Sequence, residues 1–253
     1  MKILLKIFSF LLVAGVMAGC SKNDDENGGG SNWKPNLGDY DPVPLSDFDN
    51  GFYKWCVSKF DATGDGILQY GEIKTVEKIY FDWGGRPEPR LESLNGIKYF
   101  SSLRYLGDYN GWMCENMATL DLSHNLMLDT LKFGNYGSKL RNLTLGNKQH
   151  LKYLYVNAPS LVSLDVAKCP NLKYLSISSH QLTSLDLSKC TLLEKLTCSF
   201  VSIISLDVST CRNLKELDVF GSRDGSLKTL YVWKGWVKPD RWHYPESTQI
   251  IEK

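Results

Sequence analysis

The chain has 253 residues, of which 43% are hydrophobic and 23% are charged, so it is long enough to bury a sizeable core. Its 29 Lys and Arg residues nearly balance 28 Asp and Glu residues, which gives a formal net charge of +1 at pH 7. No basic block stands out, which argues against nucleic-acid binding, because such binding needs clustered Lys and Arg to displace counterions.

Residues 1–19 are predicted to be a signal peptide, with Lys2 and Lys6 near its start. The apolar run from residue 7 to residue 17 is too short for a stable transmembrane helix, which needs roughly 20 apolar residues. Small residues then precede Cys20, and this order resembles the lipobox of bacterial lipoproteins. The resemblance implies that Cys20 is acylated and anchors the protein in a membrane. The alternative is a plain signal peptide with an incidental cysteine.

Residues 20–44 are predicted to be the lipid anchor and a flexible tether. Residues 21–30 contain no apolar side chain, so they cannot bury enough surface to fold. Lys22 and the acidic run Asp24–Glu26 resemble the export signal of surface lipoproteins in Bacteroidetes, although an ordinary solvated linker has a similar composition. The resemblance implies an outer-membrane protein that faces the cell exterior.

Residues 45–75 are expected to form a helix-loop-helix element. A helix capped by Ser46 is expected to run through Phe60, and a shorter helix from Tyr70 to about residue 75. The segment between them resembles the EF-hand loop, which holds calcium through oxygen ligands. The resemblance implies a structural Ca²⁺ site made of Asp61, Thr63, Asp65, Ile67, Gln69 and Glu72, with Ile67 acting through its backbone carbonyl.

Two features of this loop depart from the EF-hand pattern. Thr63 stands where Asp or Asn is usual, so only three carboxylates serve the ion. No second loop is available to pair with the apolar position at Leu68. The alternative is a turn without metal, since Asp-Gly pairs are common in turns.

Residues 76–234 carry an internal repeat. Pairs of apolar residues that flank a single residue recur every 10 to 13 residues, and two such steps form a unit that is 21 residues long between Leu143 and Leu206. Each pair points two side chains to the same side of an extended segment, and stacked units bury a continuous core. The pattern resembles the leucine-rich-repeat family, which implies a β-rich solenoid of parallel strands.

Two kinds of half-turn alternate within each unit. The half-turn that we call arm A ends in Cys169, Cys190 or Cys211, and in Asn125 in an earlier, looser copy. The other half-turn, arm B, follows each arm A. The three cysteines form a column in adjacent turns about 5 Å apart. A disulfide, a metal site and a structural ladder are the alternatives, and the family resemblance favours the ladder, in which Asn or Cys turns inward to backbone groups.

Both ends of such a stack need caps, because the last apolar layers would otherwise be exposed. The segment Leu91–Phe100 resembles the irregular first repeat of related Bacteroidetes proteins, and Val76–Phe81 is a candidate for an even earlier strand. Residues 235–253 are expected to cover the last layer with aromatic side chains, and a sugar-binding platform is the alternative.

Arm B is the predicted partner-binding face. Arm A exposes nearly the same residues in successive turns, whereas arm B exposes different ones and is rich in tyrosine, which is favoured at interface hot spots. The alternative is that these tyrosines pack sideways on neighbouring turns. The predicted contact residues on arm B are Tyr153, Tyr155, Tyr174, Ser176, Thr197, Asp218, Phe220, Tyr231 and Trp233.

The sequence thus predicts a surface-anchored binding module for a protein or peptide, with a host protein as one candidate partner. Capture of carbohydrate in a glycan-uptake system is the alternative. The four histidines share no metal-ligand spacing, and neither a Gly-x-Ser-x-Gly elbow nor a phosphate-binding glycine loop is present. We therefore do not expect an enzyme.

Overall fold

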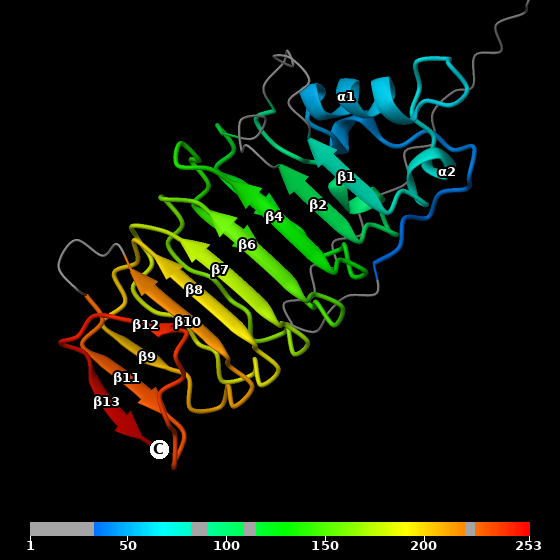
Figure 1. The fold of residues 1–253 in the computed structure, drawn as a ribbon. Coiled ribbons are helices and arrows are strands. Elements are labelled where there is room, and N and C mark those ends of the chain that lie inside the picture. Colours follow the sequence, from blue (N-terminus) through cyan, green and yellow to red (C-terminus); the bar gives the residue numbers. More distant parts are fainter. Residues whose placement is uncertain (1–32, 82–90, 109–114, 221–225) are drawn as a thin grey trace, which may run out of the picture.

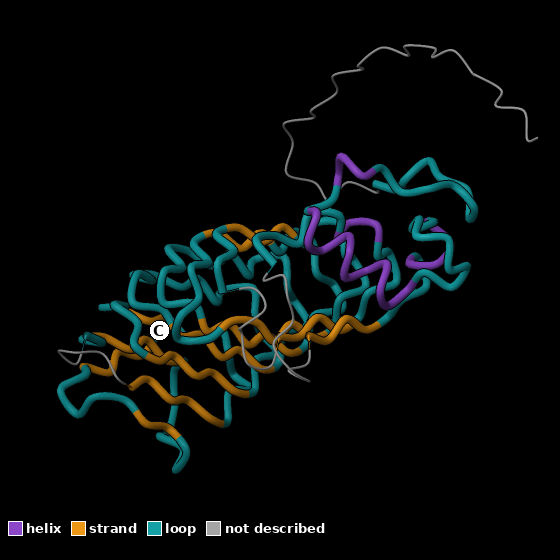
Figure 2. The backbone as a smooth tube through the Cα atoms, turned by 90° about the horizontal axis from the view of Figure 1, so that it is seen from above, coloured by secondary structure: helices purple, strands orange, loops and turns teal. Residues whose placement is uncertain are grey.

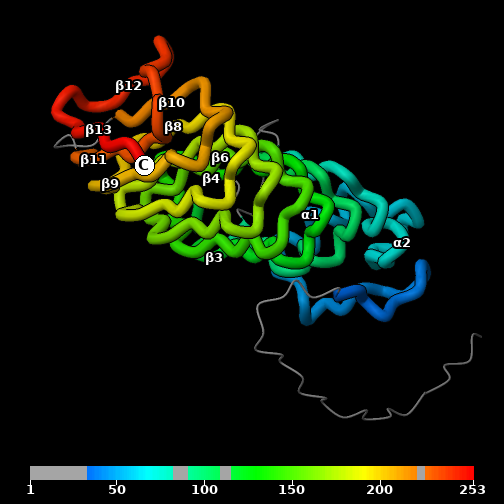
Figure 3. The backbone as a smooth tube through the Cα atoms, turned by 90° about the horizontal axis from the view of Figure 1, so that it is seen from below, coloured from blue at the N-terminus to red at the C-terminus, as the bar shows by residue number. Residues whose placement is uncertain are grey.

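The computed structural model describes residues 33–81, 91–108, 115–220 and 226–253. Successive turns of the chain stack along one axis, from the blue end of the sequence to the red end (Figures 1 and 3). The fold is the leucine-rich-repeat solenoid that the apolar pairs predict. The predicted signal peptide, Cys20 and the first part of the tether lie outside the described residues.

The helices gather at the front end of the solenoid (Figure 2). They are the 3-10 helices η1 (Leu45–Asp47) and η2 (Ile97–Tyr99) and the α-helices α1 (Asn50–Phe60) and α2 (Tyr70–Ile73). Phe52 and Cys56 of α1 are fully buried, which places one face of the helix on the core. In the described segments, no helix combines the length and the hydropathy that crossing a bilayer requires.

The predicted cap of α1 was wrong. Ser46 lies within η1, and the chain is extended at Phe48 and Asp49 before α1 begins. The Asp49 side chain therefore caps the helix, and it accepts a hydrogen bond from the Phe52 backbone nitrogen at 2.9 Å.

The arm B strands form one continuous parallel sheet of eight strands (Figure 1). In spatial order they are β1 (Lys78–Phe81), β2 (Tyr105–Asp108), β4 (Thr130–Gly134), β6 (Tyr153–Asn157), β7 (Tyr174–Ser178), β8 (Lys195–Ser199), β10 (Glu216–Phe220) and β12 (Trp242–His243). Leu154, Leu175, Leu196 and Leu217 lie side by side in the register, so the 21-residue period is the spacing between neighbouring strands. The expected early strand is β1.

Arm A is less regular, and its described strands form two separate sheets. One pairs β3 (Thr119–Asp121) with β5 (Asn142–Thr144), and the other joins β9 (Ser205–Asp207), β11 (Thr229–Val232) and β13 (Gln249–Glu252). Between them, Asp165 and Asp186 each accept a hydrogen bond from the backbone nitrogen two residues further on. These short turns end each extended segment after the leucine pair.

A short 3-10 helix, η2 (Ile97–Tyr99), closes the first repeat, in which Leu91, Leu94 and Phe100 are buried. At the other end, residues 235–253 add β12, the last strand of the arm B sheet, and β13, the last strand of the three-stranded arm A sheet. Trp242 is buried there, with its ring 5.2 Å from that of Trp236 and 6.0 Å from that of Trp233. The aromatic side chains thus cover the final layer.

The cysteine column is a structural ladder, as the family resemblance implied. The Cys190 and Cys211 thiols each donate to a backbone carbonyl of the preceding turn at 3.8 Å. Asn125 donates to the Ile97 carbonyl at 2.9 Å, which satisfies an earlier bend in the same way. The cysteines in the described part of the chain are free and buried, and burial raises the pKa of Cys190 to about 12.

A lysine occupies one position of this ladder, which the sequence reasoning missed. Lys148 is buried, and its ammonium donates to the Leu122 carbonyl at 2.8 Å. The signal was present, because Lys148 stands three residues after Leu145, just as Cys169 stands three residues after Val166. Burial lowers the pKa of Lys148 to about 8.

Candidate partner-binding face

The outward side chains of the arm B sheet form rows that cross the strands. In the first row, Tyr153, Tyr174 and Lys195 are register partners, followed by Glu216. In the second row, Lys132 precedes Tyr155, and Ser176, Thr197 and Asp218 follow. Phe220 is the last member of a third row, next to Ser199. Seven of the nine predicted contact residues therefore share one face.

Two of the predicted contact residues were placed on the wrong arm. Tyr231 belongs to β11, which pairs with β9 on arm A, and Trp233 follows it towards the closing tryptophans. The half-turns alternate strictly, and β11 is the half-turn after β10, so it must return on the opposite side. The face therefore ends at β10 and β12.

The tyrosines surround a shallow groove of about 210 Å³ in the middle of this sheet. The Tyr153 and Tyr174 rings are stacked, with centroids 4.9 Å apart and an angle of 13° between their planes. Tyr155 stands beside them and is 44% exposed. The groove is lined by Lys132, Tyr153, Leu154, Tyr155, Tyr174, Leu175, Ser176, Lys195 and Thr197.

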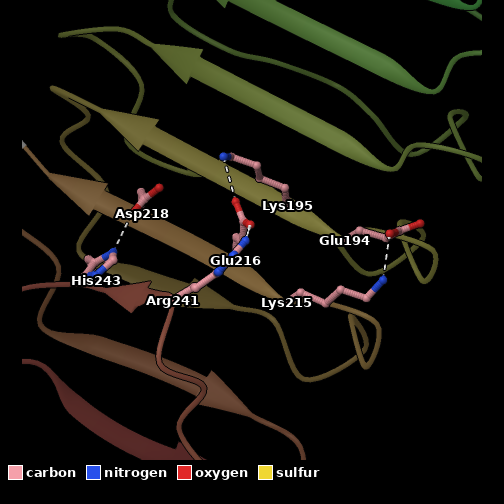
Figure 4. Close-up of polar contacts among 7 residues, drawn as sticks. All are labelled: Glu194, Lys195, Lys215, Glu216, Asp218, Arg241 and His243. Carbon is pink, nitrogen blue, oxygen red and sulfur yellow. Dashed lines mark hydrogen bonds and ion pairs between the residues drawn. The ribbon is translucent and has the colours of Figure 1, made fainter.

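Charged residues flank the groove towards the C-terminal end of the solenoid and form two triads, of which Figure 4 shows all members except Lys173. Glu194 lies between Lys173 at 3.1 Å and Lys215 at 3.0 Å. Glu216 lies between Lys195 at 2.7 Å and Arg241. These cations hold the pKa of both carboxyl groups below the ordinary value, because each carboxylate accepts hydrogen bonds from two of them. Each triad therefore carries one excess positive charge.

An aromatic ridge, which the sequence reasoning missed, lies beyond the carboxyl ends of the strands. The Phe200 ring has its centroid 5.8 Å from His180 and 6.5 Å from Tyr136, which is 75% exposed. The Phe200 backbone nitrogen also donates to the Phe220 carbonyl at 3.0 Å. Among the described non-glycine residues, only Phe200 has a positive φ, 56°, a strained conformation for an aromatic residue. The ridge extends the candidate face.

In the EF-hand-like loop, residues 61–72, the carboxylates accept hydrogen bonds from backbone nitrogens of the same loop. Asp61 accepts from the Gly64 and Gly66 nitrogens at 2.6 and 2.8 Å, and this hydrogen bonding, the Gly66 one foremost, lowers the pKa of Asp61. Glu72 reaches back to the nitrogens of Ala62 and Thr63. Asp65 accepts from the Ile67 nitrogen at 2.8 Å. The three predicted acidic ligands therefore belong to one compact, exposed loop.

Gln69, the spacing of the acidic side chains and the contact of Leu68 bear on whether this loop fits a cation. The Gln69 side-chain oxygen, at one of the predicted ligand positions, is buried without a close hydrogen-bond partner, and the Gln69 side chain faces the Glu72 backbone nitrogen in a capping box. Within the described ranges, however, no three His, Cys, Asp or Glu side chains lie close enough to form a ready metal site. The Leu68 carbonyl accepts from the Val43 nitrogen at 3.0 Å, so the tether takes the place of the missing second loop.

A second hollow, of about 290 Å³, lies at the front of arm A. Its lining includes Asp47, Lys98, Asp121 and His124. Lys98 pairs with Asp47 at 2.8 Å, and the Tyr99 hydroxyl donates to the same carboxylate at 2.5 Å. These contacts lower the pKa of Asp47 and leave it engaged by its neighbours.

No family model and no curated protein matches the chain. Among solved structures, it is similar to an internalin from Listeria monocytogenes, with 20% sequence identity and a TM-score of 0.48, over 75% of this chain and 52% of that one. It is also similar to the functional domain of InlJ from the same organism, described as including a cysteine ladder, with 19% identity and a TM-score of 0.28, over 66% and 41% of the chains.

A leucine-rich-repeat protein from Leptospira interrogans is similar as well, with 21% identity and a TM-score of 0.26, over 56% of this chain and 52% of that one. The chain thus spans about half the length of these proteins, between 41% and 52%. At such identities the likeness concerns the fold alone.

Proposed function

We propose that the chain is a binding module that recognises a protein or peptide through the outward face of the arm B sheet. The observation that carries this proposal is the tyrosine groove, where stacked and exposed aromatic rings lie among side chains that change from turn to turn. Aromatic residues with a polar tip combine apolar contact area with hydrogen bonding, which favours them at interfaces.

The geometry of the tyrosine pair favours a protein or peptide over a sugar. A stacking platform for a sugar offers a flat ring face to the ligand. In the groove, Tyr153 and Tyr174 turn ring faces towards each other at 4.9 Å, so these two faces are covered, although the residues are 43% and 37% exposed. Edges and hydroxyl groups suit contact with backbone amides and side chains. Carbohydrate capture remains the second candidate, because Tyr155 is exposed beside the pair.

The test is a selection from a random peptide library with the Tyr153→Ala/Tyr174→Ala double variant as counter-target. We expect enriched peptides that bind the natural protein and not the variant. Tyr40→Ala is the matched control, because Tyr40 is 93% exposed and lies outside the sheet. Enrichment that is equal on all three proteins, or hits on a glycan array with none in the library, would contradict the proposal.

We also propose that the module is attached to the outer membrane through a lipid on Cys20 and faces the cell exterior. The support is the order of basic residues, apolar run, small residues and cysteine in the sequence. Cys20→Ser removes the thiol that would be acylated. Labelling with a fatty-acid analogue should then disappear, and equal labelling of the variant would refute the anchor.

Structural calcium in the loop that ends at Glu72 is a further part of the proposal. Three carboxylates, the Thr63 hydroxyl, the Ile67 carbonyl and the Gln69 side-chain oxygen would supply the hard oxygen ligands that calcium prefers. When bound, the ion would offset the repulsion among the carboxylates. The loop residues themselves hold the turn through their backbone hydrogen bonds.

A further inference from the structure

The charges around the tyrosine groove suggest the chemistry of the partner. Lys132 and Lys195 line the groove, and no carboxylate does. Lys152 directly precedes Tyr153 at the same end of the strands and is exposed. Among the described residues, neither Lys132, which lines the groove, nor Lys152, which precedes Tyr153, forms an ion pair, so both ammonium groups are uncompensated.

Two carboxylates of this face, those of Glu194 and Glu216, are covered by the cations that bind them. The Glu194 and Glu216 side chains are each 24% exposed, whereas Lys215 and Arg241 are 73% and 76% exposed. A partner that approaches the sheet therefore meets the ammonium and guanidinium groups first. Asp129 is likewise engaged, because the Thr130 hydroxyl donates to it at 2.7 Å.

The excess of positive charge is local to this face. From β4 to β12, including the residue before each strand, six cations and four carboxylates occupy it: Lys132, Lys152, Lys173, Lys195, Lys215 and Arg241 against Asp129, Glu194, Glu216 and Asp218. The whole chain is nearly neutral, with a formal charge of +1. Complementary charge steers association and selects among partners.

From this arrangement we infer that the groove binds an extended, acidic peptide segment, whose carboxylates meet the lysine rim while its backbone and apolar side chains lie on the tyrosines. This inference rests on the proposed function. The strands from β4 to β8 span roughly 15 Å, since neighbouring strands are about 4.8 Å apart, and about five extended residues, at about 3.3 Å each, cross this distance, so a peptide of about eight residues extends beyond both edges of the groove.

The experiment measures fluorescence anisotropy of three labelled peptides of about eight residues, in which threonine alternates with glutamate, glutamine or lysine. We expect the glutamate peptide to bind at least about tenfold more tightly than the glutamine peptide, and to weaken between about 50 and 300 mM salt. The lysine peptide should bind least.

Charge reversal locates the effect. Lys132→Glu together with Lys152→Glu should reduce binding of the glutamate peptide by about tenfold or more. Both side chains are exposed, so the fold should persist, which thermal melting checks. Lys228→Glu is the matched control, because Lys228 is exposed just before β11, on the other side of the solenoid.

The outcomes separate this inference from the proposed function. Equal binding of the glutamate and glutamine peptides, both lost in Tyr153→Ala/Tyr174→Ala, would overturn the preference for acidic segments and leave peptide binding standing. Binding of polyglucuronate with no binding of any peptide would overturn both. A salt-insensitive interaction that survives the double lysine reversal would also overturn the inference.

Discussion

Arm A and arm B use the same inward leucine pairs but differ in what they turn towards solvent. On arm A, an aspartate recurs in successive turns, and Asp121, Asp165, Asp186 and Asp207 each accept a hydrogen bond from the nitrogen two residues on, at 2.8 to 2.9 Å. On arm B, the outward residues change from strand to strand and contact one another across the sheet.

The difference separates two uses of surface residues. A side chain that bonds its own backbone serves the local turn, so the same residue is useful in each turn. A side chain that contacts its neighbours across strands leaves the backbone satisfied by the sheet and is free to vary. Repetition within one chain therefore indicates a structural position, and variation indicates a position available for a partner.

The largest effect is expected where both arms are alike, in the core. Leu175 is buried in β7, and Leu175→Ala should lower the free energy of unfolding by about 2–5 kcal/mol through lost burial and a residual cavity. Ser176→Ala, the outward neighbour, should change it by about 0.5 kcal/mol or less. Denaturant unfolding measures both, and equal losses would show that the inward and outward sides of arm B are assigned wrongly.

Lys148, the buried lysine of the ladder, should make the free energy of unfolding depend on pH. Because burial lowers the pKa of Lys148 to about 8, the unfolded chain holds this proton more tightly than the folded one between that value and the ordinary 10.5. Stability contributed by this group should therefore rise with pH across that window, by up to about 3 kcal/mol. Urea unfolding between pH 7 and about 10.5 measures the rise.

Lys148→Met isolates this contribution, since methionine fills similar space without a charge. The buried thiols act in the opposite sense, because burial raises the pKa of Cys169 to about 11, so only the difference between the natural protein and the variant is informative. That difference should shift in favour of the natural protein as pH rises. A difference that is constant with pH would mean that Lys148 is solvated.

The fold was predictable because its signals are local. A leucine pair such as Leu175 and Ile177 specifies an extended segment with one buried side, and its spacing of 21 residues from Leu196 and Cys198 specifies the neighbour. The same spacing predicted that Cys190 stands in a column with Cys169 and Cys211, and the family resemblance predicted that this column turns inward. Lys148 was missed because its residue type suggests a surface, although its spacing places it in the column.

The candidate site was less predictable, because it depends on contacts between strands. Tyr153 and Tyr174 are 21 residues apart, and the sequence shows that they share a row, but it does not show that their rings stack. The 13-residue step before Leu230 obscured the alternation of arms and led to the wrong placement of Tyr231. The ridge around Phe200 comes from loops, whose conformation no periodicity encodes.

Calcium distinguishes the front of the solenoid from the repeat stack. If the loop binds the ion only when folded, calcium at a hundredfold excess over its Kd should stabilise the folded form by roughly 2.7 kcal/mol. Melting in chelator and in millimolar calcium measures this, and Glu72→Gln should abolish the difference. Glu77→Gln is the control, because the Glu77 side chain is 66% exposed beyond α2. Identical melting with and without calcium would leave the loop as a plain turn.

The smallest expected effect contrasts two aspartates, one on each arm. Asp186 accepts from the Ser188 nitrogen at 2.8 Å, so Asp186→Ala should cost about 0.5–1 kcal/mol of unfolding free energy. Asp218 contacts His243 at 2.7 Å across the exposed sheet, and Asp218→Ala should cost less, about 0–0.5 kcal/mol.

The contribution of Asp186 also depends on pH, because the hydrogen bond from the Ser188 nitrogen lowers the pKa of Asp186 below 3.8. Its contribution is therefore complete above that pH and is lost as the pH falls through the lower, folded-state value, so the gap between Asp186→Ala and the natural protein should close on acidification. Chemical denaturation at neutral and acidic pH measures the gap, and an Asp218→Ala variant that loses more stability than Asp186→Ala would show that arm B, like arm A, uses its outward carboxylates to hold the fold.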